Sequence, residues 1–577
     1  MVIKKIKVGK LIKKIIPKID INLIFIISLV AFIYLISYPF ILKFNNENIP
    51  QGDPYTYTNG WLIFINNLNN HHYLTNIFHI LTNSGWYLYQ NILLTILYPL
   101  IQLKVESIAL INFVPFTIAM LIIYKIFKKL FSKEIGILIA LLYALMPWHH
   151  GLDQATSLFS LQLDSIYVNT LTPTILLLAM HLITDQQKKN LNVLTGIFMG
   201  LTVWSRANSI IPLILVIILF ALHKFKLDIE KIYTFVKDKK TSFIIFSSMT
   251  LYYYLRFYKI VINYYSGLNN YVHFNKDLFF NHLLTIPSIF IYGIHFNNKN
   301  LIEITSLILY IFMVVETYIA ILEIKNKKNI EINKLIIFSV NVFFTIFLLY
   351  VYRFHSLDLW QGYIVILGPL FIFFSCIAAK KLSQVHIKNK FIITTFVFVI
   401  LTTILYNTYL NTPPLEFNKN KSEHVFDPKK LSKFSNEIEM NFPKKKIASF
   451  YYGDSFNVPL LNYYRLLSGN KELSIGAGEE DLIYTNQYTK NAWNLTSTKT
   501  KEETKKFIYL TFKDANYIVI ANKKECYDGY HEPTYSIYSN SKYIYDALNE
   551  NIKNFSIKDS FISGNCTINI WERISKR

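Results

Sequence analysis

Long apolar segments alternate with short polar ones over the first 410 residues of the chain. A helix needs about 20 mostly apolar residues to cross the hydrocarbon core of a bilayer, and about eleven runs approach this length. The pattern predicts transmembrane helices at residues 21–42, 107–127, 135–148, 166–184, 191–204, 208–222, 242–258, 301–322, 335–354, 362–379 and 391–410. The first run exceeds the apolar core of a signal peptide and no small-residue cleavage site follows it, which favours an uncleaved span.

Two connections between the predicted spans are long, at residues 43–106 and 258–300. Loops of more than about 15 residues in compact proteins are usually functional or have structure of their own. Residues 86–103 are apolar and aromatic. We interpret them as an interfacial helix on the outer leaflet, because a span here would reverse the charge pattern of all later loops.

Polar residues dominate from about residue 411, after which Pro413 and Pro414 end the last predicted helix. Short β-rich runs begin at Ile447, Tyr517 and Ile568, and they alternate with helix-like stretches at residues 457–467, 502–512 and 542–551. Strands that alternate with helices predict a small α/β domain. The expected fold class is therefore a polytopic α-helical membrane protein, with a transmembrane domain at residues 1–410 and an exoplasmic C-terminal α/β domain at residues 411–577.

The chain has 59 Lys and Arg against 37 Asp and Glu, a formal net charge of +22. These basic residues do not form one face, which argues against a nucleic-acid partner. Most of the excess lies in clusters between alternate apolar runs, at residues 4–18, 125–133, 188–189, 224–240, 325–334 and 380–390. The positive-inside rule makes these clusters cytoplasmic. We therefore predict a multi-pass protein of the plasma membrane with a cytoplasmic N-terminus.

The chain has three cysteines, too few for a disulfide framework. Cys376 lies inside an apolar run, whereas Cys526 and Cys566 lie in the polar C-terminal region. This region is expected to face an oxidising compartment. A disulfide between Cys526 and Cys566 and two free thiols are there equally consistent with the sequence.

The sequence QGDPYTYTNGW places Asp53 in a turn-prone context at the exoplasmic interface, shortly after the first span. A carboxylate in this position can act as a general base, which removes a proton from an acceptor hydroxyl while a glycosyl donor is attacked. The same residue can instead initiate a turn or cap a helix.

The overall architecture resembles the GT-C superfamily of membrane glycosyltransferases, including the protein O-mannosyltransferases and the lipid A aminoarabinose transferase. Asp53 is followed by Pro54 and Tyr55, and this string is similar to one in the oligosaccharyltransferase catalytic subunits. Further similar stretches are PWHHGLD at residues 147–153, WSRANSIIP at 204–212, RFHSLDLWQG at 353–362 and FYYGDSFNVPLLNYY at 450–464. The resemblance implies transfer of a sugar from a polyprenyl-phosphate donor to a lipid, glycan or protein acceptor at the outer face, with Asp53 as base.

The chain departs from that superfamily at three places. Asp53 has no second acidic residue beside it, the second exoplasmic loop has no Asp-x-Asp, and the C-terminal region has no Trp-Trp-Asp. These departures argue against oligosaccharyltransferase activity and leave a divalent-metal requirement uncertain, and we expect no other cofactor. A single-sugar transferase fits the sequence better.

Few basic residues lie at the exoplasmic ends of the predicted spans. They are Arg206, Arg256, Lys259 and Arg353. An Arg can hold the donor phosphate with two hydrogen bonds, although each of these residues can equally anchor the chain to lipid headgroups.

Histidine and acidic residues gather in two exoplasmic loops, as His149, His150, Asp153 and Asp164 in the second and His355 with Asp358 in the fifth. None has a recognised zinc spacing, which favours ordinary polar loop residues. Among the loop residues, Tyr55, Asp153 and His355 are our candidates for substrate contacts.

Glu316 lies near the middle of the eighth predicted span. An ionisable group at that depth marks either a functional residue or a protonated carboxyl hydrogen-bonded between helices.

Two other classes of protein compete with a transferase. A carrier or flippase of envelope precursors predicts paired ionisable residues at mid-bilayer depth and internal repeats, whereas the sequence has only Glu316 and no repeat. A polysaccharide polymerase usually has its main loop between spans, whereas the polar bulk of this chain is terminal. We therefore expect a glycosyltransferase.

Overall fold

The computed structural model describes residues 24–31, 33, 35, 88–101, 110–149, 158, 164–183, 189–206, 209–226, 228–269, 276–292, 299–353, 359–385, 447–449, 516–521, 549–563 and 566–574. The chain divides into two compact units, which we describe separately. The first comprises Met1–Glu47, Trp86–Phe257 and Val272–Thr412, and the second comprises Asn48–Gly85, Tyr258–Tyr271 and Pro413–Arg577.

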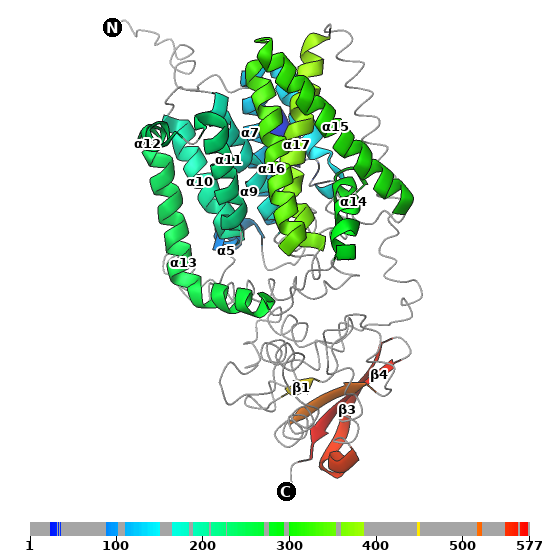
Figure 1. The fold of residues 1–577 in the computed structure, drawn as a ribbon. Coiled ribbons are helices and arrows are strands. Elements are labelled where there is room, and N and C mark those ends of the chain that lie inside the picture. The colour runs from blue at the N-terminus through cyan, green and yellow to red at the C-terminus, as the bar shows by residue number, and fades with distance from the viewer. Residues whose placement is uncertain are drawn as a thin grey trace, which may run out of the picture. The chain divides into compact units, whose positions relative to one another are not determined.

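The first unit is a bundle of α-helices (Figure 1), the last part of α13 after Phe257 being assigned to the second unit. The helices are α5 Leu88–Ile101, α7 Leu110–Leu130, α8 Lys133–Ala144, α9 Asp164–Ile183, α10 Lys189–Ser205, α11 Ile210–Phe225, α12 Ile229–Asp238, α13 Lys240–Asn269, α14 Lys276–Tyr292, α15 Lys299–Lys325, α16 Ile330–Arg353 and α17 Leu359–Gln384, and a short 3₁₀ helix η1 is formed by Pro147–His149. Each predicted span that falls on described residues is helical, and the span predicted at residues 391–410 lies outside them.

Within the described residues, fewer helices than predicted are long enough to cross a bilayer. Among the described residues, five helices are long and apolar enough to cross a membrane, and six if α11 and α12 count as one bent span. Helix α8 has 12 residues, and at 1.5 Å per residue it is about 18 Å long, well short of a hydrocarbon core of about 30 Å. The predicted helices are thus confirmed as helices, whereas the count of about eleven spans stays a prediction.

Helix α9 lies at the centre of the bundle, where residues 165–182 are all buried. Hydroxyl groups line its contact with α10: the Oγ1 atoms of Thr174 and Thr202 are 2.9 Å apart, and Thr170 Oγ1 is 3.4 Å from Ser205 Oγ. Thr170 and Thr174 also lie within hydrogen-bonding distance of a carbonyl in the preceding turn of α9. In a membrane these bonds satisfy polar groups that lipid cannot, and they hold α9 and α10 together.

Glycines bring α10 and α17 close to their neighbours. A Cβ atom at Gly196 of α10 would lie 2.6 Å from the carbonyl oxygen of Ser242 in α13, whereas one at Gly368 of α17 would lie 2.9 Å from the hydroxyl of Thr172. A hydroxyl can rotate away, but a helix carbonyl can move only with its helix.

We expect Gly196→Ala to destabilise the bundle by about 1–3 kcal/mol, because it forces α10 and α13 apart. Gly368→Ala is the matched control and should destabilise the bundle less than Gly196→Ala does. Thermal unfolding of both variants in detergent checks this. An equal or larger loss for Gly368→Ala would contradict the explanation.

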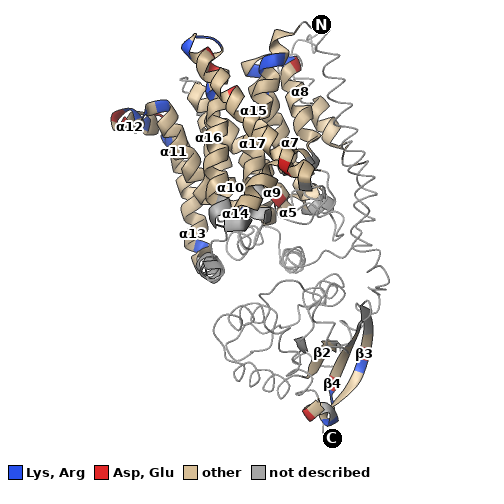
Figure 2. Ribbon diagram, turned by 45° about the vertical axis from the view of Figure 1, so that its right-hand side comes forward, with Lys and Arg blue, Asp and Glu red and all other residues tan. Residues whose placement is uncertain are grey.

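Lysines of the helical unit gather at one end of the bundle, which we call the basic end (Figure 2). They lie where α7 meets α8, from the end of α11 to the start of α13, where α15 meets α16, and at the end of α17. The opposite end, which we call the far end, contains Asp164 and Arg206. This separation is the charge pattern that the sequence predicts for the two sides of a membrane.

A buried polar cluster joins three helices at the basic end. Lys380 of α17 pairs with Glu323 of α15 at 2.7 Å and donates to Asn333 Oδ1 of α16 at 3.1 Å. Asn333 in turn donates to Glu323 Oε2 at 2.8 Å. Lys380 is buried, so Glu323 and Asn333 replace the water that would otherwise solvate its ammonium group.

Two helices occupy segments that the sequence analysis treated as connections. Helix α12 forms within the lysine-rich segment after α11 and is capped at its N-terminus by Asp228, whose Oδ1 accepts from the Lys231 N–H at 3.2 Å. Helix α14 forms within the long connection at residues 258–300 and packs antiparallel to α15, where Tyr310 donates to the Leu283 carbonyl at 2.8 Å. The expectation that this connection has its own structure is confirmed.

Helix α5 forms where an interfacial helix is predicted. Its 14 residues extend about 21 Å, too short to cross the hydrocarbon core. Its position in the membrane stays a prediction.

The second unit contains a four-stranded sheet in the order β1-β2-β4-β3. The strands are β1 Ile447–Ser449, β2 Tyr517–Ala521, β3 Phe555–Ser563 and β4 Cys566–Arg573. Strands β1 and β2 are parallel, whereas β3 and β4 form an antiparallel hairpin with an irregularity between Ile557 and Asp559. The strands predicted at Ile447, Tyr517 and Ile568 are confirmed. A parallel pair needs a crossover connection, which is consistent with the α/β prediction.

Buried residues of β2 and β4 form the centre of this sheet, including Ile518, Ile520 and Ile570. Burial raises the pKa of the Tyr517 phenol, which stays protonated and donates to Glu572 Oε1 at 2.8 Å. Cys566 begins β4, but Cys526 and the helix-like stretches at residues 457–467 and 502–512 lie outside the described residues. The domain boundary and the disulfide stay predictions.

Candidate functional site

The far end of the bundle contains an ion pair between the first residue of α9 and the residue that follows α10. Arg206 Nη1 donates to Asp164 Oδ1, and the two side chains are 25% and 15% exposed. The guanidinium carbon of Arg206 also lies 5.7 Å from the centroid of the Tyr167 ring. Because α9 and α10 run antiparallel, the start of one helix and the end of the other meet here. The result is a half-buried cation held by a carboxylate and an aromatic face.

The backbone around Arg206 is fixed by Ser209. The Ser209 Oγ lies 2.8 Å from the Thr202 carbonyl oxygen and 2.6 Å from the Arg206 carbonyl oxygen, so its one proton is shared between these two acceptors. The first carbonyl lies in the last turn of α10 and the second directly after it, and each also accepts a backbone N–H, from Arg206 and Ser209 respectively. The serine therefore stabilises the turn that presents the Arg206 side chain.

Asp164 also lies favourably with respect to its own helix, because it is the acidic residue in the first turn of α9. The N-terminus of a helix has a partial positive charge, which stabilises a carboxylate. Asp164 is thus placed to orient the Arg206 guanidinium. A guanidinium has five N–H donors in a planar fork, a geometry suited to phosphate oxygens.

His149 packs deep in the bundle near this end rather than in an exposed loop. Its ring is fully buried, and its centroid lies 4.9 Å from that of Phe116 and 4.8 Å from that of Tyr143. The expectation of an ordinary polar loop residue is wrong for His149, because η1 folds back against α7 and α8. Among the described residues, no group of three His, Cys, Asp or Glu side chains could hold a metal ion.

Tyr143 connects this aromatic cluster to α9. Its hydroxyl donates to Asn169 Oδ1 at 2.8 Å, and Asn169 Nδ2 donates to the Ser165 carbonyl at 2.8 Å. Asn169 is thus fixed one turn beyond Asp164 and stabilises the start of α9.

Helix α13 brings a second arginine toward the far end. Trp204 of α10 donates its indole N–H to the Met249 carbonyl at 2.8 Å, and its ring lies 6.1 Å from that of Tyr252. Arg256 follows one turn later on α13 and is exposed.

The third candidate, Arg353, is the last residue of α16. The backbone of Lys259 belongs to α13.

The remaining candidates lie outside the described residues. They are Asp53, Tyr55, Asp153 and His355, together with His150 and Asp358. Whether Asp53 and an arginine line one cavity therefore stays a prediction.

The ion pair itself was missed by the sequence analysis, which treated Asp164 as a loop residue and Arg206 as a separate phosphate contact. A usable signal is present: an acidic residue precedes one apolar run, and a basic residue follows the next. Antiparallel helices of similar length bring such residues together.

Glu316 is buried in α15, at 7% exposure. Met313 and Ala320, one turn to either side, are also buried, so Glu316 lies on the inward face of a helix whose outer face is largely exposed. Both interpretations of Glu316 stay predictions.

The apolar helices and the separation of charge define a polytopic membrane protein. Residues 89–258 match the family model described as dolichyl-phosphate-mannose-protein mannosyltransferase. This segment extends from α5 into α13 and contains both Asp164 and Arg206. The resemblance to the GT-C superfamily of membrane glycosyltransferases is thereby confirmed, and the match supports a glycosyltransferase.

Among solved structures, the chain is similar to the oligosaccharyltransferase of Archaeoglobus fulgidus. One crystal structure is tethered with an acceptor peptide containing the NVT sequon; it is 13% identical with a TM-score of 0.41, and the match covers 84% of this chain and 65% of that one. The other is a complex with Zn and sulfate, at 14% identity and a TM-score of 0.40, with 90% and 69% covered. The chain thus spans about two thirds of that enzyme's length. No curated protein matches the chain at a significant level.

Proposed function

We propose that the protein transfers a sugar from a polyprenyl-phosphate-linked donor to an acceptor hydroxyl at the outer membrane face. The observation that carries this proposal is the mannosyltransferase match over residues 89–258. That segment includes the half-buried Arg206, whose side chain is suited to a phosphate. The acceptor is a lipid, a glycan or a protein.

In the proposed reaction, the Asp53 carboxylate removes the proton from the acceptor hydroxyl. The acceptor oxygen attacks C1 of the sugar from the face opposite the phosphate, a new C1–O bond forms, and the bond from C1 to the phosphate oxygen breaks. The polyprenyl phosphate leaves with the bonding electrons, and the configuration at C1 is inverted.

Cationic side chains stabilise the charge that develops on the leaving phosphate. We assign this role to Arg206, Arg256 and Arg353. Tyr55, Asp153 and His355 are assigned to contacts with the sugar or the acceptor.

The proposed orientation follows from charge. With the basic end of the bundle in the cytoplasm, Arg206 and the other candidates face the outside of the plasma membrane, as does the C-terminal α/β domain. The N-terminus is then cytoplasmic.

The experiment that tests the function uses the full-length protein in liposomes, with polyprenyl phosphates that bear different radiolabelled sugars. Release of polyprenyl phosphate together with a labelled acceptor product is expected for one of them. Movement of intact donor across the bilayer would identify a carrier instead. Stepwise growth of one labelled chain would identify a polymerase.

Arg206→Lys is expected to lower transfer by about 10- to 100-fold, because Lys keeps the charge but loses the planar fork of donors. The loss should appear mainly as a higher KM for the donor. Lys224→Arg at the basic end is the control and should leave transfer unchanged. An unchanged KM in a folded Arg206→Lys protein would remove Arg206 from the site.

A further inference from the structure

Helix α12 has an exposed apolar face at the basic end of the bundle. Ile229, Tyr233 and Val236 are 80%, 70% and 39% exposed, and their spacing of three and four residues places them on one face of the helix. None of the ten residues of α12, all of which the structure describes, is buried. Large apolar side chains that are exposed together indicate a surface that meets something other than water.

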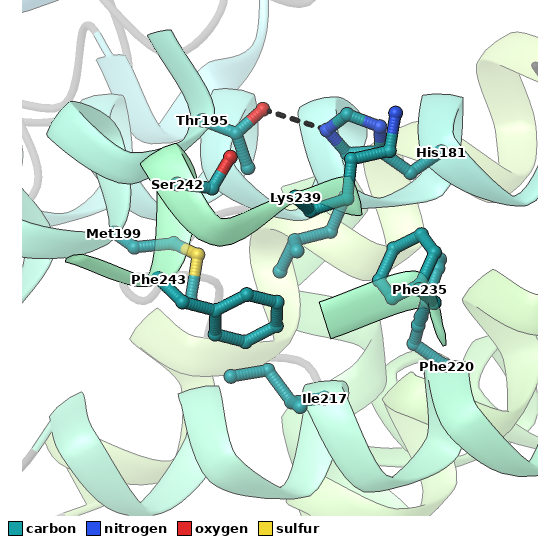
Figure 3. Close-up of a pocket in the computed structure, with 10 residues that line it drawn as sticks. His181, Thr195, Met199, Ile217, Phe220, Phe235, Lys239, Ser242 and Phe243 are labelled. Atoms are coloured by element: carbon teal, nitrogen blue, oxygen red, sulfur yellow. Dashed lines mark hydrogen bonds between the residues drawn. The ribbon is translucent and has the colours of Figure 1, made fainter. Parts of the chain in front are cut away.

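A different side of α12 packs against the bundle. The centroid of the Phe235 ring lies 5.1 Å from those of Phe220 and Phe225. Figure 3 shows Phe235 and Phe220 together, among the side chains that surround a small space inside the bundle. Successive residues of a helix are about 100° apart around its axis. The contact of Phe235 therefore turns the exposed apolar face away from the bundle.

Polar side chains occupy most of the remaining surface of α12. They are Glu230, Lys231, Thr234, Lys237 and Asp238. Four of the ten residues are thus charged, and charged side chains are costly in the hydrocarbon core of a bilayer. The helix cannot continue the apolar span of α11 through that core, which leaves the boundary between lipid and water as its place.

The position of α12 in the fold agrees with such a boundary. The helix is bent by 115° from α11, and α13 begins directly after it at Lys240. Figures 1 and 2 both show α12 at the edge of the bundle. Residues 224–240 contain six Lys against three Asp and Glu. This excess of cations suits the phosphates of lipid headgroups, whereas the apolar face suits the acyl chains just below them.

We infer that α12 lies in the plane of the membrane at the basic end, with Ile229, Tyr233 and Val236 inserted among the lipids of the adjacent leaflet. A short helix with one apolar face, a charged remainder and flanking lysines has the composition of an interfacial helix. The partner of this face is therefore a phospholipid leaflet. The surface lies at the opposite end of the α9–α10 pair from Arg206, and the inference does not depend on the proposed function.

The test uses the full-length protein in liposomes of phosphatidylethanolamine and phosphatidylglycerol. Tyr233→p-benzoylphenylalanine places a photoreactive group on the apolar face, where ultraviolet light attaches it to neighbouring C–H bonds. Thr234→p-benzoylphenylalanine is the matched control, because Thr234 is exposed on the polar side of the same turn. Mass spectrometry of the labelled peptides measures the yield of lipid adducts.

Lipid adducts are expected to be at least about tenfold more abundant at position 233 than at position 234, because an interfacial helix buries its apolar face about 5–10 Å into the boundary of headgroups and acyl chains. Equal yields would mean that no face of α12 is inserted and would overturn the inference. Crosslinks from position 233 to another part of the chain or to a second copy, in place of lipid, would assign the face to a protein contact and would also overturn it.

Ile229→p-benzoylphenylalanine is a second probe of the same face if the protein does not tolerate the group at position 233. Its side chain is 80% exposed, so the replacement should leave the packing of the bundle unchanged. A folded protein that forms no more lipid adducts at position 229 than at position 234 would contradict insertion of the apolar face.

Discussion

The Asp53→Asn substitution is expected to lower sugar transfer by about 100- to 10 000-fold, the usual contribution of a general base. A carboxamide has nearly the shape of a carboxylate but cannot take the acceptor proton. The measurement is the rate of label transfer from the lipid-linked sugar to the acceptor. Donor binding should change little.

This substitution also distinguishes the two interpretations of Asp53, a general base or a residue that initiates a turn or caps a helix. Asn initiates turns and caps helices about as well as Asp, so a purely structural residue would tolerate it. The control is Asp358→Asn in another exoplasmic loop, which should retain transfer. Normal transfer by Asp53→Asn, in a protein made at the normal level, would refute the proposed mechanism.

The Glu323→Leu substitution is expected to destabilise the helical bundle by about 3 kcal/mol, because it leaves Lys380 buried without its carboxylate. This is the low end of the range for a broken buried pair, since Glu323 itself is 25% exposed. The measurement is thermal or denaturant unfolding of the purified protein in detergent.

Two further variants test the cause. Glu323→Gln keeps a side-chain oxygen that can accept the hydrogen bond from Asn333, so it should destabilise the protein less than Glu323→Leu does. The double variant with Glu323→Leu and Lys380→Met removes both charges and should recover most of the loss. A double variant less stable than Glu323→Leu alone would show that the lost charge pair is not the cause.

The helices could be predicted because their apolar runs are long and end in lysines. Helix α12 could not be predicted in the same way, because charged residues interrupt its apolar ones and the segment resembles a polar connection. Helix α14 is interrupted by Pro287 and preceded by polar residues. Strand β3, with Lys558 and Asp559 in its middle, has no apolar run at all.

Contacts between helices were less accessible from the sequence. The cluster of Glu323, Asn333 and Lys380 depends on the rotational orientation of three helices about their axes. The apolar pattern of the sequence does not determine that orientation. The pair of Asp164 and Arg206 was accessible, since it needs only that α9 and α10 run antiparallel. The roles of Asp53, Tyr55, Asp153 and His355 rest on sequence resemblance alone.

The burial of α9 bears on how the chain enters the membrane during synthesis. Among the candidate spans, α9 has the lowest mean hydropathy, 1.6, with 94% of its window buried, whereas α15 has 2.1 with 22% buried. A segment with so many hydroxyl and amide groups gains little from lipid alone. We expect α15 to partition into the bilayer by itself. Helix α9, by contrast, must stay at the insertion machinery until α10 emerges and its hydroxyl groups can form hydrogen bonds with the threonines of α9.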